Sequence, residues 1–263
     1  MSKELDFAIA TAKEAGDYLM SQYGKMHELE WKLKTNFKTE VDDYNDVLIR
    51  RRIQENFPHH NIYSEEQDAL LNEGSSLSWV IDPLDGTIPY RYGITDHFSV
   101  CIALVSGKTP LLGVTYAPKR NELYFAERGK GAFCNGEKIQ VLDEDNINKI
   151  LIGLDGGKET ETFKRAALAK YEERLYSSDG VTCTLSSGCA SVPLALVASG
   201  KLHAYMALSL EPWDMAAGVI INREAGAKVT NIKNEEWTLD DPSIITANPS
   251  LHRNLYNFVR DIN

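Results

Sequence analysis

An apolar strand that ends abruptly in acidic residues is the strongest constraint on this chain. Residues 79–81 are typical of a buried strand end, and Asp82-Pro-Leu-Asp85-Gly-Thr87 follows them directly. We expect Pro83 to end the hydrogen-bond ladder of the strand, because proline has no backbone N–H. Two carboxylates at such a place are costly unless a cation or several hydrogen-bond donors meet them. The fold therefore has to bring such partners to this end of the strand.

Acidic residues far away in the chain can complete a cation site with this pair. Glu65 lies shortly before the apolar run, and Asp214 falls in the first turn of a predicted helix. With Asp82 and Asp85 they form a set of hard oxygen donors that contains no sulfur or imidazole. Such a set favours Mg²⁺ or Mn²⁺ over zinc or copper.

The turn after the strand also suits an anion. The gap between Asp82 and Asp85 allows a tight turn with both carboxylates and the Leu84 carbonyl on one side. Gly86 lets the backbone come close to a ligand, and the amides of Gly86 and Thr87, at an expected helix start, can donate to phosphate oxygens.

Each of these pieces also has a simpler interpretation. Asp82 and Asp85 can form an ordinary turn with a capping aspartate, and Asp214 can be a helix N-cap. Glu65-Glu66 can be a solvated loop. Taken together, the residues leave a catalytic and a structural metal site equally open.

Composition narrows the class of protein. The chain has 263 residues, of which 43% are hydrophobic and 25% charged, as in ordinary globular proteins. A net charge of -10 argues against DNA or RNA as a partner, whereas a small anionic substrate stays possible if bound cations reverse the local field. No apolar run is long enough to span a membrane, and the polar N-terminus does not resemble a secretory signal. We expect a cytoplasmic protein with reduced, mostly buried thiols at Cys101, Cys134, Cys183 and Cys189.

Hydrophobic periodicity predicts two halves of different texture. Residues 1–145 are expected to hold a helix pair (4–23 and 41–57) and an antiparallel meander (79–141). Residues 146–263 are expected to form an α/β subdomain that supplies Asp214 and the substrate side, packed tightly on the first half. Its expected strands are 149–154 and 202–208, and its expected helices are 160–174, 191–198 and 213–225.

These motifs resemble the inositol monophosphatase family of Mg²⁺-dependent, lithium-sensitive phosphatases. The resemblance runs almost end to end, and its segments are Thr39-Glu-Val-Asp42, Glu65-Glu66, residues 82–87, Ser187-Gly-Cys-Ala190, Trp213-Asp214 and Glu224-Ala-Gly226. It implies the layered αβαβα sandwich of the inositol monophosphatase and fructose bisphosphatase type, in the mixed α+β and α/β class. It further implies two or three Mg²⁺ ions, with Mn²⁺ as a possible substitute, and a homodimer.

The resemblance also implies a role for each site residue. The metal ligands would be Glu65, Asp82, the Leu84 carbonyl, Asp85 and Asp214. Glu66 would orient a metal-bound water, and Thr87 with Asp42 would activate that nucleophile. The substrate would contact Asp85, Gly86, Thr87, Ala190 and Asp214. The expected reaction is in-line hydrolysis of a small phosphate monoester, with no covalent phosphoenzyme.

Departures from the family pattern leave the substrate open. Ala207 stands where inositol-hydrolysing members carry a glutamate, and Glu211 is near but in another register. Arg91 can be a surface charge or a substrate contact, and Lys34 lies in a loop that is short for the family. Inositol monophosphate is the leading substrate, with histidinol phosphate, fructose 1,6-bisphosphate and 3′-phosphoadenosine 5′-phosphate as alternatives. A non-catalytic regulatory protein that binds metal and phosphate is the hypothesis from another class.

Overall fold

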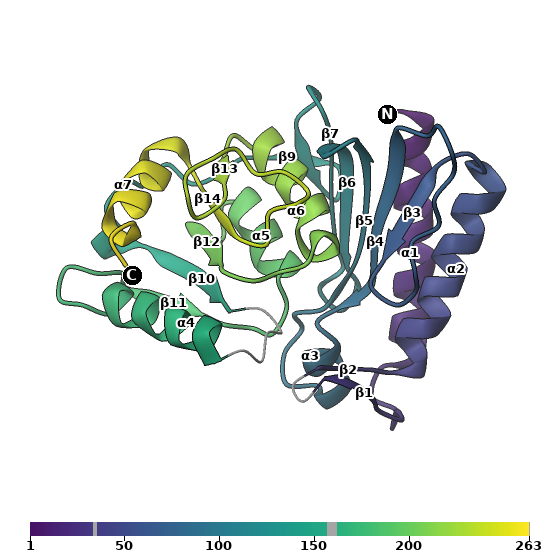
Figure 1. Ribbon diagram of the computed structural model, residues 1–263, viewed down its shortest axis with the longest axis horizontal. Helices are drawn as coiled ribbons and strands as arrows, with labels where there is room; N and C mark the ends of the chain where they lie inside the picture. The colour runs from purple at the N-terminus through teal and green to yellow at the C-terminus, as the bar shows by residue number, and fades with distance from the viewer. Residues whose placement is uncertain (34–35, 157–161, 263) are drawn as a thin grey trace.

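A computed structural model describes residues 1–33, 36–156 and 162–262 (Figure 1). Within these ranges the chain forms two β-sheets, a small hairpin and helices that cover the sheets. The helices are α1 (Lys3–Gln22), α2 (Glu40–Asn56), α3 (Thr87–Tyr92), α4 (Thr162–Leu175), α5 (Ser191–Ala198), α6 (Pro212–Glu224) and α7 (Pro249–Val259), with short 3-10 turns at Pro118–Arg120 and Ile147–Lys149. No helix in the described part of the chain is long and apolar enough to cross a membrane.

The larger sheet has seven strands in the order β3-β4-β5-β6-β7-β8-β9. Only the β3–β4 pair is parallel, and the remaining pairs form the predicted antiparallel meander. The strands are β3 (Asn61–Ser64), β4 (Leu77–Asp85), β5 (Ser99–Ser106), β6 (Thr109–Ala117), β7 (Glu122–Glu127), β8 (Ala132–Cys134) and β9 (Glu137–Ile139).

The prediction that Pro83 ends its strand was wrong. β4 continues to Asp85, and its pairing with β5 shifts register between Asp82 and Asp85. The missing N–H of Pro83 thus interrupts the ladder locally, as a bulge, and the pairing resumes at Asp85 opposite Ser99.

The smaller sheet is mixed and lies in the second half of the chain. Its order is β11-β10-β12-β14-β13, with β10 parallel to both β11 and β12 and the other pairs antiparallel. The strands are β10 (Leu151–Asp155), β11 (Cys183–Leu185), β12 (Ala204–Ala207), β13 (Lys228–Thr230) and β14 (Ile244–Ala247). A separate hairpin, β1 (Glu30–Leu33) and β2 (Asn36–Lys38), lies next to α3 in Figure 1.

The layers alternate as predicted, in an αβαβα sandwich (Figure 1). Helices α1 and α2 pack on one face of the larger sheet, and their apolar side chains join those of β4, β5 and β6 in one core. Helices α5 and α6 fill the space between the two sheets, in a second core. Helices α4 and α7 cover the outer face of the smaller sheet, in a third. The predicted helices and strands start and end within about two residues of those observed.

The four cysteines are free, as expected, but they are less buried than predicted. Cys101 and Cys189 are buried, Cys134 is half-buried and Cys183 is exposed on β11. The division of the chain after residue 145 stays a prediction.

Candidate functional site

Three carboxylates from distant parts of the chain meet at the end of β4. Glu65 follows β3, Asp82 lies in β4 and Asp214 lies in the first turn of α6, and one oxygen from each falls within 4.8 Å of the others. β3 and β4 are parallel neighbours, so their carboxyl ends reach the same edge of the sheet. The solvated-loop interpretation of Glu65-Glu66 was wrong, because the two side chains are only 8% and 1% exposed.

Backbone amides hold one oxygen of the aspartates in this region. Asp82 Oδ1 accepts the Leu84 N–H at 3.0 Å, and Asp214 Oδ2 accepts the Glu211 N–H at 2.9 Å. The second contact makes Asp214 the third residue of a capping box at the start of α6, with Glu211 as the N-cap. The other oxygens, Asp82 Oδ2 and Asp214 Oδ1, are buried. The amide contacts thus fix the rotamers that turn these oxygens inward.

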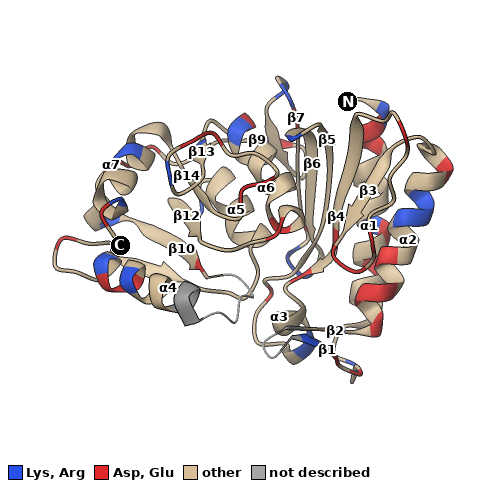
Figure 2. Cartoon of the chain, in the orientation of Figure 1, with Lys and Arg blue, Asp and Glu red and all other residues tan. Residues whose placement is uncertain are grey.

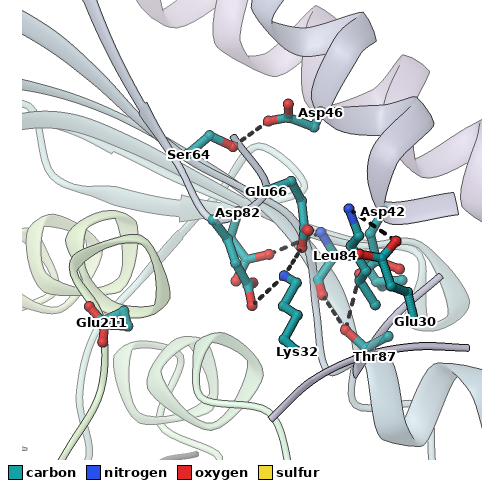
Figure 3. Close-up of polar contacts among 12 residues, drawn as sticks. Glu30, Lys32, Asp42, Asp46, Ser64, Glu66, Asp82, Leu84, Thr87 and Glu211 are labelled. Atoms are coloured by element: carbon teal, nitrogen blue, oxygen red, sulfur yellow. Dashed lines mark hydrogen bonds and ion pairs between the residues drawn. The ribbon is translucent and has the colours of Figure 1, made fainter. Parts of the chain in front are cut away.

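Asp42 repeats this capping arrangement at the start of α2. Its Oδ2 accepts the Thr39 N–H at 2.8 Å and the Thr39 hydroxyl at 2.6 Å. Its Oδ1 lies 3.1 Å from the Thr87 hydroxyl, which is also 3.2 Å from the Leu84 carbonyl oxygen. Burial raises the pKa of Asp42 to about 6, against the pull of its hydrogen bonds. The structure therefore brings together the predicted Thr87–Asp42 pair (Figure 3).

Asp85 points to a different partner, the start of α5. Its Oδ2 accepts the N–H groups of Ala190 at 3.0 Å and Ser191 at 2.7 Å, together with the Ser191 hydroxyl. The thiol of Cys189 donates to the same oxygen at 3.0 Å, and burial raises the pKa of that thiol well above its usual value. Asp85 is thus outside the group of three carboxylates and ties β4 to the second half of the chain.

Gly86 occupies a position that a larger residue would not tolerate. It has a left-handed backbone (φ 87°) and caps the start of α3. A Cβ on Gly86 would lie 2.5 Å from the His97 carbonyl oxygen and 3.1 Å from the Phe98 Cα. Both atoms belong to the backbone, so the turn that carries Thr87 depends on glycine.

Lys32 enters the site from β1, a contact that the sequence analysis missed. Its Nζ lies 2.6 Å from Glu66 Oε1 (Figure 3) and 3.5 Å from Glu65 Oε1. Burial and the neighbouring Glu65 raise the pKa of Glu66 to about 7, although the ammonium of Lys32 opposes this shift. The alternating charged residues Glu30 and Lys32 on one short strand were the available sequence signal for this contact. The partner, Glu66, lies 34 residues further along the chain.

The other residues that the sequence singled out lie in several different parts of the fold. Ala190 is the buried N-cap of α5, and Ala207 is buried at the end of β12. The side chain of Glu211 is exposed and lies away from Asp82 (Figure 3). Arg91 is half-buried and donates from Nε to the His27 carbonyl oxygen at 3.2 Å. Lys34 lies outside the described residues.

The donor set fits a hard divalent cation. All candidate ligand atoms are oxygens, and Glu66 Oε2 is buried without a hydrogen-bond partner among the described residues. Figure 2 shows further acidic residues at the start of α2, where the first turn holds Glu40, Asp42 and Asp43. Carboxylates gathered in this way repel one another until a cation joins them. Mg²⁺ and Mn²⁺ match such ligands best.

Replacing Lys32 should destabilise the protein only when metal is absent. In Lys32→Met the Glu65–Glu66 pair loses its ammonium, so we expect the free energy of unfolding in EDTA to fall by about 1–3 kcal/mol. Mg²⁺ should remove most of this loss, because the ion supplies the missing positive charge. Urea unfolding with and without Mg²⁺ measures both values.

Lys38→Met is the matched control. Lys38 pairs with the half-exposed Asp43 at 2.8 Å, and such a pair contributes about 1 kcal/mol or less. Its effect should be the same with and without Mg²⁺. A Lys32→Met loss that Mg²⁺ leaves unchanged would contradict the assignment of a cation to this cluster.

The metal-free protein should lose stability as the pH rises. The pKa values of Asp42 and Glu66 are raised, so the folded state holds these protons more tightly than the unfolded chain. Their contribution is complete below about pH 4 and is lost as the pH passes through 6 to 7. In EDTA, Tm measured by circular dichroism should therefore fall between pH 5 and pH 8. Glu66→Gln should show a smaller fall, and an equal or steeper fall in that variant would contradict the prediction.

The chain matches a known protein family and is similar in sequence to several known proteins. The model of the inositol monophosphatase family matches residues 1–263. A Thermotoga maritima protein named fructose-1,6-bisphosphatase/inositol-1-monophosphatase is 33% identical, over 98% of this chain and 96% of its own length. An inositol-1-monophosphatase of Bacillus subtilis is 31% identical, over 93% and 91%. A putative Nus factor SuhB of Neisseria meningitidis is 31% identical, over 95% of each.

Solved structures agree with this result. SuhB of Bartonella henselae superposes with a TM-score of 0.92 at 27% identity, over 99% of both chains. An IMPase of Thermotoga maritima does so with a TM-score of 0.86 at 30% identity, over 99% of this chain and 98% of that one. Sequence, fold and relatives lead to one conclusion: the chain belongs to the inositol monophosphatase family and is a phosphoric monoester hydrolase.

Proposed function

We propose that this protein hydrolyses a small phosphate monoester with Mg²⁺, and that inositol monophosphate is its leading substrate. The observation that carries the proposal is the meeting of Glu65, Asp82 and Asp214 within 4.8 Å, beside the Thr87–Asp42 hydrogen bond. A purely structural metal site does not need a buried hydroxyl–carboxylate pair next to it. The pair therefore favours catalysis.

The metal ligands follow from the positions of the oxygens. We assign Glu65, Asp82 and Asp214 as ligands shared by two or three Mg²⁺ ions, with Mn²⁺ as a substitute. The Leu84 carbonyl and the second oxygen of Asp85 complete the proposed set. When bound, these ions supply a water of lowered pKa and a counter-charge for the phosphate and for the departing alkoxide.

Proton transfer is assigned to Thr87 and Asp42. The Thr87 hydroxyl takes a proton from the attacking water and passes its own to Asp42 Oδ1, 3.1 Å away. The pKa of Asp42, about 6, makes that carboxylate basic enough to hold a proton near neutral pH. Glu66, whose pKa is raised to about 7, orients the same water.

Substrate binding is assigned to the turn and to the start of α5. The amides of Gly86 and Thr87 donate to the equatorial phosphate oxygens, where charge gathers in the transition state. Ala190, with Asp85 and Asp214, lines the side where the alcohol half sits. We further propose a cytoplasmic homodimer that lithium inhibits by taking one Mg²⁺ position, and a division into residues 1–145 and 146–263.

Phosphate release from a panel of esters tests the proposal. The panel holds inositol 1-phosphate, histidinol phosphate, fructose 1,6-bisphosphate and 3′-phosphoadenosine 5′-phosphate, each with Mg²⁺ and with EDTA. We expect Mg²⁺-dependent turnover that is highest for inositol 1-phosphate. Higher turnover of another ester would keep the reaction and replace the substrate.

Two acid-to-amide variants serve as controls. Asp85→Asn should lower turnover at least about 1,000-fold while circular dichroism shows an intact fold, because catalysis loses a metal ligand. Glu211→Gln removes the charge of an exposed side chain, keeps the backbone N–H that Asp214 accepts, and should stay within about twofold of the parent. An active Asp85→Asn protein would contradict the assignment of that ligand.

A non-catalytic role is the second candidate, because several relatives at about 31% identity are named Nus factor SuhB. The acidic net charge of this chain does not favour a nucleic-acid partner. Calorimetry that detects Mg²⁺ binding, with no turnover of any ester in the panel, would favour this second candidate.

A further inference from the structure

A carboxylate outside the predicted site lies at the same end of the smaller sheet. Asp155 is the last residue of β10, and its register partner on the parallel strand β12 is Ala207. Partners in register point to the same face of a sheet. Tyr205 and Ala207 belong to the core around α5 and α6, whereas Ala204 and Met206 belong to the core under α4 and α7. Asp155 therefore points to the layer that holds the starts of α5 and α6.

The side chain of Asp155 is half-buried and held by two hydroxyl groups. Tyr205 donates to Oδ2 at 2.9 Å, and Ser186 donates to Oδ1 at 3.2 Å. Burial raises the pKa of Asp155 to about 7, the two hydrogen bonds oppose this, and the charge of Asp85 raises it further. Ser186 contacts Asp155, and Ala190 in the same short segment contacts Asp85, so this segment joins the surroundings of the two carboxylates.

The carboxylate of Asp155 can accept further hydrogen bonds. An ionised carboxylate has about four acceptor positions, and the contacts described here use two. Its register partner Ala207 is buried and has no polar group, so Asp155 is the acidic member of this pair at the strand end. Ser186 precedes Ala190 by four residues, and the amide of Ala190 binds Asp85. One short segment therefore links Asp155, Asp85 and the proposed alcohol side.

We propose that Asp155 is a specificity-determining residue that accepts a hydrogen bond from a hydroxyl group on the alcohol half of the substrate. The inference rests on the proposed function, which it deepens by assigning a residue that selects the alcohol half of the substrate. Tyr205 and Ser186 are positioning residues that fix the two oxygens of Asp155. A site that binds a substrate hydroxyl in this way discriminates against esters that lack one.

Two substrates separate this role from a structural one. Inositol 1-phosphate has hydroxyl groups on its alcohol half, and phenyl phosphate has none. In Asp155→Ala we expect kcat/KM for inositol 1-phosphate to fall about 10- to 100-fold, as for the loss of a hydrogen bond to a charged group. For phenyl phosphate the value should stay within about threefold. A structural role would lower both values alike.

Two further variants guard against effects on folding. Asp155→Asn keeps the shape and one acceptor oxygen, so its selective loss should be smaller but in the same direction. Tyr205→Phe removes the 2.9 Å contact that positions Oδ2 and keeps the carboxylate, so its selective loss should be smaller than that of Asp155→Ala but in the same direction. Circular dichroism confirms the fold of each variant.

The outcomes distinguish a failure of the role proposed for Asp155 from a failure of the proposed function. Equal losses on both substrates, or no loss on either, overturn the role of Asp155 alone. A parent protein that prefers phenyl phosphate to inositol 1-phosphate also overturns it. No Mg²⁺-dependent turnover of either ester overturns the proposed function, and this inference with it.

Discussion

This site depends on hydrogen bonds from backbone amides to one oxygen of each aspartate. Asp42, Asp82, Asp85 and Asp214 all accept a main-chain N–H, each from a different turn or helix start. Hydrogen bonds to charged groups stabilise by about 1.5–3 kcal/mol each. At 4.8 Å, the upper limit of the distances between these ligand oxygens, two negative charges repel by roughly 3–4 kcal/mol at an effective dielectric constant of 20. The amides thus offset the repulsion without removing it, and a divalent cation removes it.

The fold supplies these amides at the ends of regular elements. Helix starts carry N–H groups without partners inside the helix, so a carboxylate is stable there. Asp42 and Asp214 use their own helices, and Asp85 uses the start of α5, 106 residues further along the chain. The αβαβα layering therefore serves the site directly, since it points the starts of α2, α5 and α6 at the end of β4. Lys32 adds a positive charge from the hairpin.

Much of this could be predicted from the sequence, where the signals are local. The motif at residues 82–87 and the capping pattern of Thr39 and Asp42 identify their own surroundings, and the family resemblance orders them. The bulge at Pro83 was missed, because the sequence marks the lost N–H but not the recovery of pairing beyond it. The burial of Glu65-Glu66 was in doubt for a similar reason, since both neighbouring strands are needed to enclose them.

The contacts that escaped prediction are those set by pairing across long distances. Lys32 meets Glu66 only because the hairpin folds over the end of β4, and Asp155 gains significance only from its register with Ala207. Neither residue belongs to a motif.

The position of the bound ion is the decisive observation for the proposed metal site. In crystals soaked with Mn²⁺, anomalous scattering should place an ion about 2.1 Å from oxygens of Glu65, Asp82 and Asp214. No anomalous peak among these carboxylates, at Mn²⁺ concentrations that saturate binding in solution, would contradict it.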